Sequence, residues 1–237
     1  MTIIKRSRVA SVVNAGKQMA KDLIIIGAAG TAREVADAID EINNLDRKWN
    51  LLGFLDDDPQ KDGRKFNGYP VLGPISESTK YPTCRFVLVL GNHRDLSFTK
   101  KVVDRLGLDD NRFATIIHPT VSVSRYAELG PGSIVLQNCV IGPDTRIGSH
   151  VLVLPGSHVG HDCIVDDHVV IASNAVLLGG VCVQQGCYIG ANATILQKVK
   201  IGPRSCVGMG AAVFSDVGPD VTMVGNPARL LSHRVRR

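Results

Sequence analysis

Residues 153–195 read VLPGSH VGHDCI VDDHVV IASNAV LLGGVC VQQGCY IGANAT I, and an aliphatic residue opens every hexad of this stretch. The same period continues in both directions without a break. The aliphatic positions are Ile117, Val123, Leu129, Val135, Ile141, Ile147, Val153, Val159, Val165, Ile171, Leu177, Val183, Ile189, Ile195, Ile201, Val207 and Val213. A fixed internal period is the signature of a repeat architecture, in which each repeat packs against its neighbours.

The remaining hexad positions predict the shape of one repeat. The fourth residue after each aliphatic is small or short and branched, and Cys139, Cys163 and Cys187 fall in this register. We interpret these cysteines as small buried core residues. Glycine often follows the aliphatic residue, and we interpret it as the residue that suits a sharp turn between short strands. These glycines are Gly130, Gly142, Gly148, Gly160, Gly190, Gly202 and Gly208. The pattern predicts about eighteen residues per triangular rung and nearly six stacked rungs of parallel strands.

The segment before the repeats alternates between strand and helix patterns. An apolar run from Leu23 to Ile26 ends at Gly27-Ala28-Ala29-Gly30, and a helix pattern follows to about residue 43. Further strands are predicted at 51–55 and 86–90, with a helix from about Asp95 to Leu106. Continuous apolar strands indicate a small parallel sheet covered on both faces. The predicted fold class is therefore an α/β Rossmann-like domain (22–115) followed by an all-β parallel β-helix (116–220).

Ligands of such sheets bind beyond the carboxyl ends of the strands. The candidate substrate-binding residues there are Gly27, Ala28, Ala29, Gly30, Thr31, Asp56, Asp57, Gly91 and Asn92. Glycine lets the backbone approach a phosphate, and a helix beginning near Thr31 offers free N–H groups to an anion. We expect a nucleotide diphosphate at this edge. The alternative is a glycine turn that only packs strand on helix, because the third glycine of the dinucleotide fingerprint is absent.

Composition and charge exclude several classes of function. The chain is 44% hydrophobic and 21% charged, and no apolar run approaches the about 18 residues of a membrane span. The net charge of +5 resides at the ends, because residues 1–21 hold five basic residues and no acid, and 229–237 hold four arginines. The remainder has 18 basic against 22 acidic residues, which argues against a nucleic-acid-binding surface.

The ends and the cysteines support further expectations. We interpret 1–21 as a disordered basic extension and 221–237 as a turn with a basic tail. Residues 1–21 lack the apolar core of a secretory signal, so we expect a cytoplasmic protein. The six cysteines show no zinc-type spacing, and we expect neither a metal nor disulfides.

The hexads resemble those of the bacterial hexapeptide-repeat acyltransferases. Ile25 to Gly30, Gly53-Phe54-Leu55-Asp56-Asp57, Ile117-His118-Pro119 and Val224-Gly225-Asn226-Pro227-Ala228 are similar to the sugar O-acyltransferase group. That group includes sialic acid O-acetyltransferases and N-acetyltransferases of UDP- or GDP-linked aminosugars. The resemblance covers Asp22 to about Arg229. It implies a left-handed coil, a homotrimer, acetyl-CoA as acyl donor, no metal, a nucleotide-sugar substrate and a role in polysaccharide biosynthesis.

The resemblance also assigns the site. Val159-Gly160-His161-Asp162-Cys163 is similar to the catalytic segment of the group, with His161 as general base and Asp162 orienting it. One rung later the Gly179 N–H would bind the thioester oxygen as charge develops there. The implied CoA-binding residues are Gly179, Gly180, Ala191, Met209, Gly225, Pro227 and Arg229. Imidazole suits the task because the acceptor must lose a proton near neutral pH. The other reading of His161 is an exposed corner histidine like His150, His158 and His168.

Three departures from the pattern of the group bear on the acceptor. Thr31 stands where many members carry His, Leu154 where an Asn often precedes the catalytic segment, and Val170 where a His is common. The departures leave open the choice between N- and O-transfer. The first hypothesis is N-acetylation of a nucleotide-linked aminosugar. The second is O-acetylation of a sugar such as sialic acid, and the third is a noncatalytic trimeric scaffold that binds a nucleotide.

Overall fold

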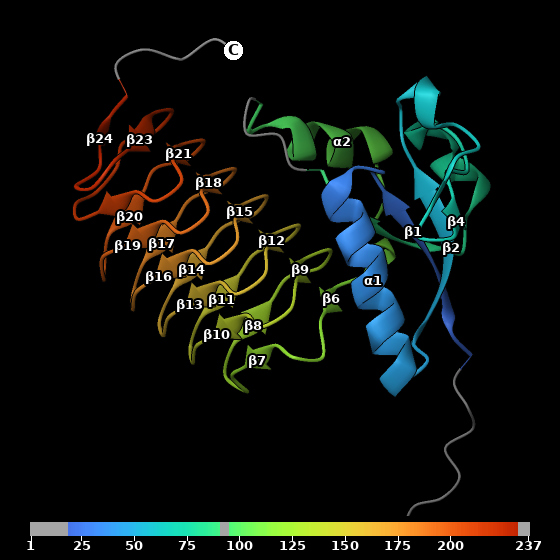
Figure 1. Ribbon diagram of the computed structural model, residues 1–237, viewed down its shortest axis with the longest axis horizontal. Helices are drawn as coiled ribbons and strands as arrows, with labels where there is room; N and C mark the ends of the chain where they lie inside the picture. Colours follow the sequence, from blue (N-terminus) through green and yellow to red (C-terminus); the bar gives the residue numbers. More distant parts are fainter. Residues whose placement is uncertain (1–18, 91–94, 232–237) are drawn as a thin grey trace, which may run out of the picture.

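The computed structural model describes residues 19–90 and 95–231, which form an α/β domain beside a parallel β-helix (Figure 1). The elements of the α/β domain are β1 (Lys21–Ile26), α1 (Gly30–Leu45), β2 (Trp49–Leu55), η1 (Pro59–Lys61), β3 (Lys65–Phe66), β4 (Tyr69–Pro70), η2 (Ile75–Lys80), β5 (Arg85–Leu88), α2 (Phe98–Leu106) and η3 (Asp110–Arg112). No helix within the described ranges is long and apolar enough to cross a membrane.

The predicted parallel sheet is present, with strand order β2-β1-β5. Val35 and Ile39 of α1 pack on the face of β1 that carries Ile25, whereas Val102 of α2 packs on the face that carries Ile24. The sheet is thus covered on both faces, as expected.

Two predicted boundaries of this domain were wrong. Helix α2 begins at Phe98 and not at Asp95, because the Asp95 carboxylate accepts hydrogen bonds from the N–H and the hydroxyl of Ser97 and holds a turn there. Lys21, which the sequence placed in the basic extension, is the first residue of β1 and pairs with Trp49. Lys5, Arg6, Arg8 and Lys17 lie outside the described residues.

Short parallel strands build the three faces of the coil. The eight-stranded face holds β6 (Ile116–Ile117), β9 (Ile134–Val135), β12 (Leu152–Val153), β15 (Val170–Ile171), β18 (Tyr188–Ile189), β21 (Cys206–Val207), β23 (Thr222–Val224) and β24 (Arg229–Leu230). The six-stranded face holds β7 (Ser122–Val123), β10 (Val140–Ile141), β13 (His158–Val159), β16 (Val176–Leu177), β19 (Thr194–Ile195) and β22 (Ala212–Val213). The five-stranded face holds β8 (Glu128–Leu129), β11 (Arg146–Ile147), β14 (Ile164–Val165), β17 (Cys182–Val183) and β20 (Lys200–Ile201).

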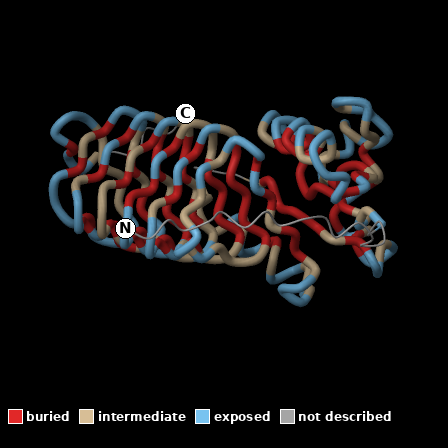
Figure 2. The backbone as a smooth tube through the Cα atoms, turned by 90° about the horizontal axis from the view of Figure 1, so that it is seen from below, coloured by how far each residue is buried: buried red, intermediate tan, exposed pale blue. Residues whose placement is uncertain are grey.

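The pairing register confirms the predicted rung. Ile141 pairs with Val159 and Val159 with Leu177, so equivalent residues stack one triangular turn apart. The aliphatic positions from Val135 to Val213 form one core inside the coil, and Figure 2 shows buried stretches recurring from rung to rung. Cys139, Cys163 and Cys187 are buried in this core, as predicted.

These cysteines also replace hydroxyl groups in a repeated hydrogen bond. Ser, Thr and Cys side chains at the small position donate to a corner carbonyl of the next rung. The pairs are Ser133 to Gly148, Cys139 to Leu154, Thr145 to Gly160, Ser157 to Ala172, Cys163 to Leu178, Cys187 to Gly202 and Ser205 to Gly218. Each bond satisfies a donor that burial would otherwise leave unpaired.

The interpretation of the hexad glycines was wrong. Gly142 and Gly160 do not have positive φ; the left-handed residue of each corner comes two positions later, as Asp162 does with φ 57°. A Cβ on Gly142 would lie 2.6 Å from the carbonyl carbon of Gly160 in the next rung. Glycine is therefore required there because the backbones of stacked corners approach too closely for a side chain.

The end of the coil also departs from the prediction. Val217 forms a bridge with Ile201, and Thr222 pairs with Cys206, so the last rung is two residues shorter than the others. Val217 thereby takes the strand position rather than the small corner position. Arg229 is not in a tail, because β24 folds back antiparallel on β23 and pairs Arg229 with Val224. Arg234, Arg236 and Arg237 lie outside the described residues.

The α/β domain packs on the first rungs of the eight-stranded face. Ile134 and Leu152 point outward from this face and are buried in the same core as Ile25 and Val35. The junction residue His118 is buried, and its Nε2 lies 2.8 Å from a carboxylate oxygen of Glu41 on α1. Apolar contact and this hydrogen bond thus hold α1 in place. Figure 1 shows α1 beside the start of the coil.

His150 and His168 were expected as exposed corner residues, and both expectations were wrong, because His150 is buried and His168 is half-buried. The side chain of His150 is 8% exposed and stacks on the His168 ring with centroids 5.4 Å apart, while Phe113 contacts it edge-on at 4.6 Å. Neither Nδ1 atom has a hydrogen-bond partner among the described residues. The α/β domain covers this corner, which the repeat alone does not reveal. Of the three, only His158 is exposed.

This histidine pair predicts a pH-dependent stability. Burial, and next the neighbouring His168, lower the pKa of His150 from 6.5 to about 4; Asp110 and Asp167 oppose the shift. Burial also lowers the pKa of His168. Because the folded pKa lies below the unfolded one, the contribution of His150 is complete above pH 6.5 and is lost as the pH falls toward 4. The loss amounts to about 3 kcal/mol in free energy of unfolding.

Urea unfolding at pH 6.5 and pH 4 measures this loss. His150→Asn keeps a neutral side chain that tolerates the left-handed backbone of residue 150, so we expect the variant to lose much less stability on acidification. His158→Asn is the matched control, since His158 is exposed. Equal acid sensitivity of His150→Asn and the unmodified protein would contradict the prediction.

Candidate active site

A cavity of roughly 400 Å³ lies between the α/β domain and the coil. The α/β domain contributes Gly27, Ala28, Ala29, Thr31, Asp56, Asp57, Lys61, Ile75, Val89, Leu90 and Phe98, and the coil contributes Leu152, Leu154, Val170 and Tyr188. Most of the substrate-binding candidates thus meet at one place. Gly30 begins α1 without lining the cavity, and Gly91 and Asn92 lie outside the described residues.

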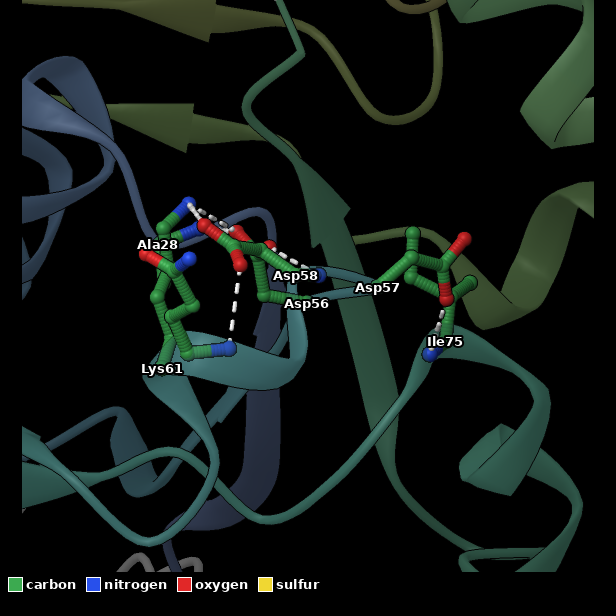
Figure 3. A network of polar contacts seen from close by, with 7 residues as sticks. Ala28, Asp56, Asp57, Asp58, Lys61 and Ile75 are labelled. Carbon is green, nitrogen blue, oxygen red and sulfur yellow. Dashed lines mark hydrogen bonds and ion pairs between the residues drawn. The ribbon is translucent and has the colours of Figure 1, made fainter.

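Asp56 organises the polar wall of the cavity (Figure 3). Its Oδ2 accepts the Ala28 N–H at 2.7 Å and lies 2.9 Å from Lys61 Nζ, and its Oδ1 accepts the Asp58 N–H at 2.9 Å. Burial alone would raise the pKa of Asp56, but the hydrogen bonds from Asp58, Lys61 and Ala28 outweigh it and lower the pKa below 3.8. The N–H group of Ala28, one of the predicted substrate-binding residues, is therefore already hydrogen-bonded to an ionised carboxylate.

Asp57 points away from that network. It accepts the Ile75 N–H at 2.9 Å and pairs with Arg105 at 2.7 Å. Figure 3 shows Asp57 directed to the side opposite Asp56 and Lys61. The two adjacent aspartates thus have different partners, and only Asp56 contacts the glycine turn.

His161 and Gly179 meet at a different place, the corner between the six- and five-stranded faces. His161 Nδ1 lies 2.7 Å from Asp162 Oδ2, and the two side chains are 66% and 65% exposed. A Cβ built on Gly179 would lie 2.4 Å from His161 Nε2 and Cε1. The stacking predicted from the eighteen-residue rung is thus present, and Gly179 leaves the space that the imidazole ring occupies.

Two backbone features complete this corner. The Gly180 N–H donates to the His161 carbonyl at 2.8 Å and fixes the two rungs together. The Gly179 N–H finds no acceptor within the described part of the chain. The N–H group of Gly179 therefore lies beside the His161 ring, and the Nδ1 atom of that ring is hydrogen-bonded to the Asp162 carboxylate.

The remaining CoA-binding candidates gather at the corner between the eight- and six-stranded faces. Met209 is 82% exposed there, one rung beyond Ala191. The turn at 225–228 joins them, because the Ala228 N–H donates to Ala212 and the Ala212 N–H donates to Gly225. Pro227 lies in this turn and Arg229 directly follows it. Within one chain these residues and the His161 corner flank the six-stranded face without meeting.

Sequence reasoning missed Lys61 and the part that the coil plays in the cavity. The outward residues of the eight-stranded face recur every rung as Ile116, Ile134, Leu152, Val170 and Tyr188. An apolar outward column on only one face of a coil indicates a covered face, and this signal was available. Thr31, Leu154 and Val170, the three departures, all line the cavity.

The described residues contain no group of three or more His, Cys, Asp or Glu arranged to hold a metal ion.

Two family models match the chain. The PglD N-terminal domain matches residues 22–97, and the bacterial transferase hexapeptide model of six repeats matches 144–179. The two models match separate stretches of the chain, and together they cover both the α/β domain and the middle rungs of the coil. The stretch matched by the PglD N-terminal model contains the glycine turn and Asp56, and the matched repeats run from the rung before His161 to Gly179.

Individual proteins are also similar to the chain. The UDP-N-acetylbacillosamine N-acetyltransferase of Bacillus subtilis (strain 168) is 32% identical over 118 residues, which span 49% of this chain and 51% of that protein. The acetyltransferase domain of PglB from Neisseria gonorrhoeae FA1090, solved with acetyl coenzyme A, is 28% identical, with TM-score 0.80 over 90% of this chain and 100% of that domain. PerB from Caulobacter crescentus, solved with CoA and GDP-perosamine, is 26% identical, with TM-score 0.76 over 88% and 96%.

These matches confirm the resemblance to the hexapeptide-repeat sugar acyltransferase group and the predicted fold class, including the left-handed coil. The aligned part of the curated relative is about half of that protein, whereas the two solved acetyltransferases match almost throughout.

Proposed function

We propose that this chain transfers the acetyl group of acetyl-CoA to the amino group of a nucleotide-linked aminosugar, with His161 as general base. The observation that carries the proposal is the corner where Asp162 holds one nitrogen of His161 and the other faces Gly179. The N-acetyltransferase relatives support it, since PerB binds CoA and GDP-perosamine and the PglB domain binds acetyl coenzyme A.

The chemistry uses each group of the corner. The amine nitrogen of the sugar attacks the thioester carbonyl carbon while His161 Nε2 takes the proton of the amine. Asp162 accepts a hydrogen bond from the Nδ1–H group of His161 and stabilises the imidazolium that forms. The Gly179 N–H, which no acceptor of the described chain occupies, donates to the oxygen as negative charge develops. The C–S bond then breaks, and the sulfur of the leaving CoA accepts the proton that the His161 imidazolium carries.

The proposal includes a homotrimer. The cavity opens between the α/β domain and the eight-stranded face, whereas His161 lies at the corner joining the other two faces. One chain therefore does not present its own cavity to its own base. The CoA candidates at the Met209 corner are likewise separate from His161. Neighbouring prisms in a closed ring bring unlike corners together, which assembles a complete site from two chains.

The test mixes the full chain with acetyl-CoA and a panel of UDP- and GDP-linked 4-aminosugars. We expect release of free CoA with one or a few of them, and a product whose added acetyl group resists mild alkali because it is an amide. An alkali-labile product would instead support O-acetylation. No CoA release across the panel, together with no measurable affinity for CoA, would refute the proposal in favour of a noncatalytic scaffold. Light scattering that shows a monomer would refute the shared site.

A further inference from the structure

Lys61 occupies a fixed position on the wall of the cavity. It is the last residue of η1, whose first turn is capped by the Asp58 carboxylate accepting the Gln60 N–H. Its Nζ lies 2.9 Å from Asp56 Oδ2 and 3.9 Å from Asp58 Oδ2, and its side chain is 24% exposed. The short turn after β2 thus brings an ammonium group to the glycine turn, as Figure 3 shows.

The charges around the cavity give this position its significance. Lys61 is the one Lys or Arg among the described lining residues, and Asp56 and Asp57 are the carboxylates. Arg105 pairs with Asp57 from outside the lining. Within residues 19–90 and 95–231, Asp56 is therefore balanced only by Lys61 and by two backbone N–H groups. Without the ammonium group, an ionised carboxylate would face any phosphate that enters.

We propose that Lys61 binds the phosphate groups of the nucleotide and at the same time screens Asp56, so that it sets the preference of the cavity for nucleotides over nucleosides. The inference rests on the nucleotide-linked substrate of the proposed function and names a residue for its recognition. Lysine suits this task because its ammonium has three donors on a flexible stem and binds phosphate as a point charge. Two of its donors remain free when Asp56 takes one.

A purely structural ion pair makes a different prediction. If Lys61 only stabilises the turn after β2, its loss lowers stability and affects nucleoside and nucleotide binding alike. If Lys61 contacts phosphate, its loss lowers the affinity for the diphosphate most, lowers that for the monophosphate less, and leaves that for the nucleoside nearly unchanged. The comparison of uridine, UMP and UDP, and of guanosine, GMP and GDP, separates the two roles because each series shares one base.

Calorimetric titration of the full chain with these two series tests the inference. We expect the preferred diphosphate to bind the unmodified protein about 10- to 100-fold more tightly than its nucleoside, the range of a charge-assisted hydrogen bond. Lys61→Met should abolish this preference and leave nucleoside affinity within about threefold, inside the ordinary variation of such measurements. Adding Asp56→Asn to Lys61→Met should restore part of the diphosphate affinity, because it removes the negative charge that Lys61 no longer balances.

Lys80→Met is the matched control. Lys80 also ends a short helix and pairs with a carboxylate, Glu77, at 2.7 Å, but it does not line the cavity. Its loss should leave all affinities unchanged. Retention of the diphosphate preference by Lys61→Met overturns the inference alone. Failure of the unmodified protein to bind either series overturns the nucleotide site of the proposed function, and this inference with it.

Discussion

His161→Ala is expected to lower the turnover number for acetyl transfer by about 10²- to 10⁴-fold, the range that general bases contribute. The amine must lose its proton as it attacks the thioester, and in the described chain the imidazole of His161 is the proton acceptor beside Gly179. The measurement is the rate of CoA release at saturating acetyl-CoA and aminosugar. The melting temperature should not change, because the His161 side chain is 66% exposed and forms no part of the core.

His158→Ala is the matched control for this variant. His158 is the first residue of β13, three residues before His161, and it is exposed. The Asp162 carboxylate is hydrogen-bonded to His161, and the atoms nearest to a Cβ on Gly179 belong to His161. The control variant should retain nearly full turnover. Full activity of His161→Ala would remove the proposed base, and an equal loss in both variants would indicate an effect on assembly rather than on proton transfer.

Gly179→Ala should lower turnover about 100-fold, the cost typical of a misplacement of about 1 Å at a reacting group. The added Cβ would lie 2.4 Å from Nε2 and Cε1 of His161, so the ring must move. The substitution keeps the Gly179 N–H in place. Single-turnover rates measure the effect, and the affinity for CoA reports whether binding survives.

The double variant shows whether Gly179→Ala acts through His161. If it does, adding Gly179→Ala to His161→Ala causes little further loss, because effects that act through one group are not additive. Gly218→Ala is the control, since a Cβ there meets nothing within 4 Å. If the fold-losses in turnover of the two single variants multiply in the double variant, the Cβ at residue 179 lowers turnover independently of His161.

Local regularity explains why so much of the coil was predictable. A residue six positions on occupies the equivalent place on the next face, and one eighteen positions on lies directly above, so Val159, Leu177 and Ile195 are related by sequence distance alone. The contact of His161 with Gly179 follows from the same arithmetic. The α/β order of β1, α1 and β2 was equally local, because the periods of strand and helix differ.

The errors occurred where the regular period stops or where contacts come from outside it. The glycines at Gly142 and Gly160 are explained by the distance between stacked backbones, which a turn argument does not contain. The shortened last rung shifts Val217 into a strand position because the register is set by pairing with Ile201. His150 resembles an exposed corner residue in sequence, but it is buried and contacts both Phe113 and His168.

The amino-acid sequence by itself determined the stacked triangular coil, the parallel sheet beside it and the meeting of His161 with Gly179, because each depends on short and repeated spacings. Only the tertiary structure decided that Leu152, Val170 and Tyr188 form the second wall of the cavity and that Lys61 is paired with Asp56. It also decided that cavity and base lie on different sides of one chain. Such features depend on how one domain packs against another, and packing joins residues that no fixed spacing relates.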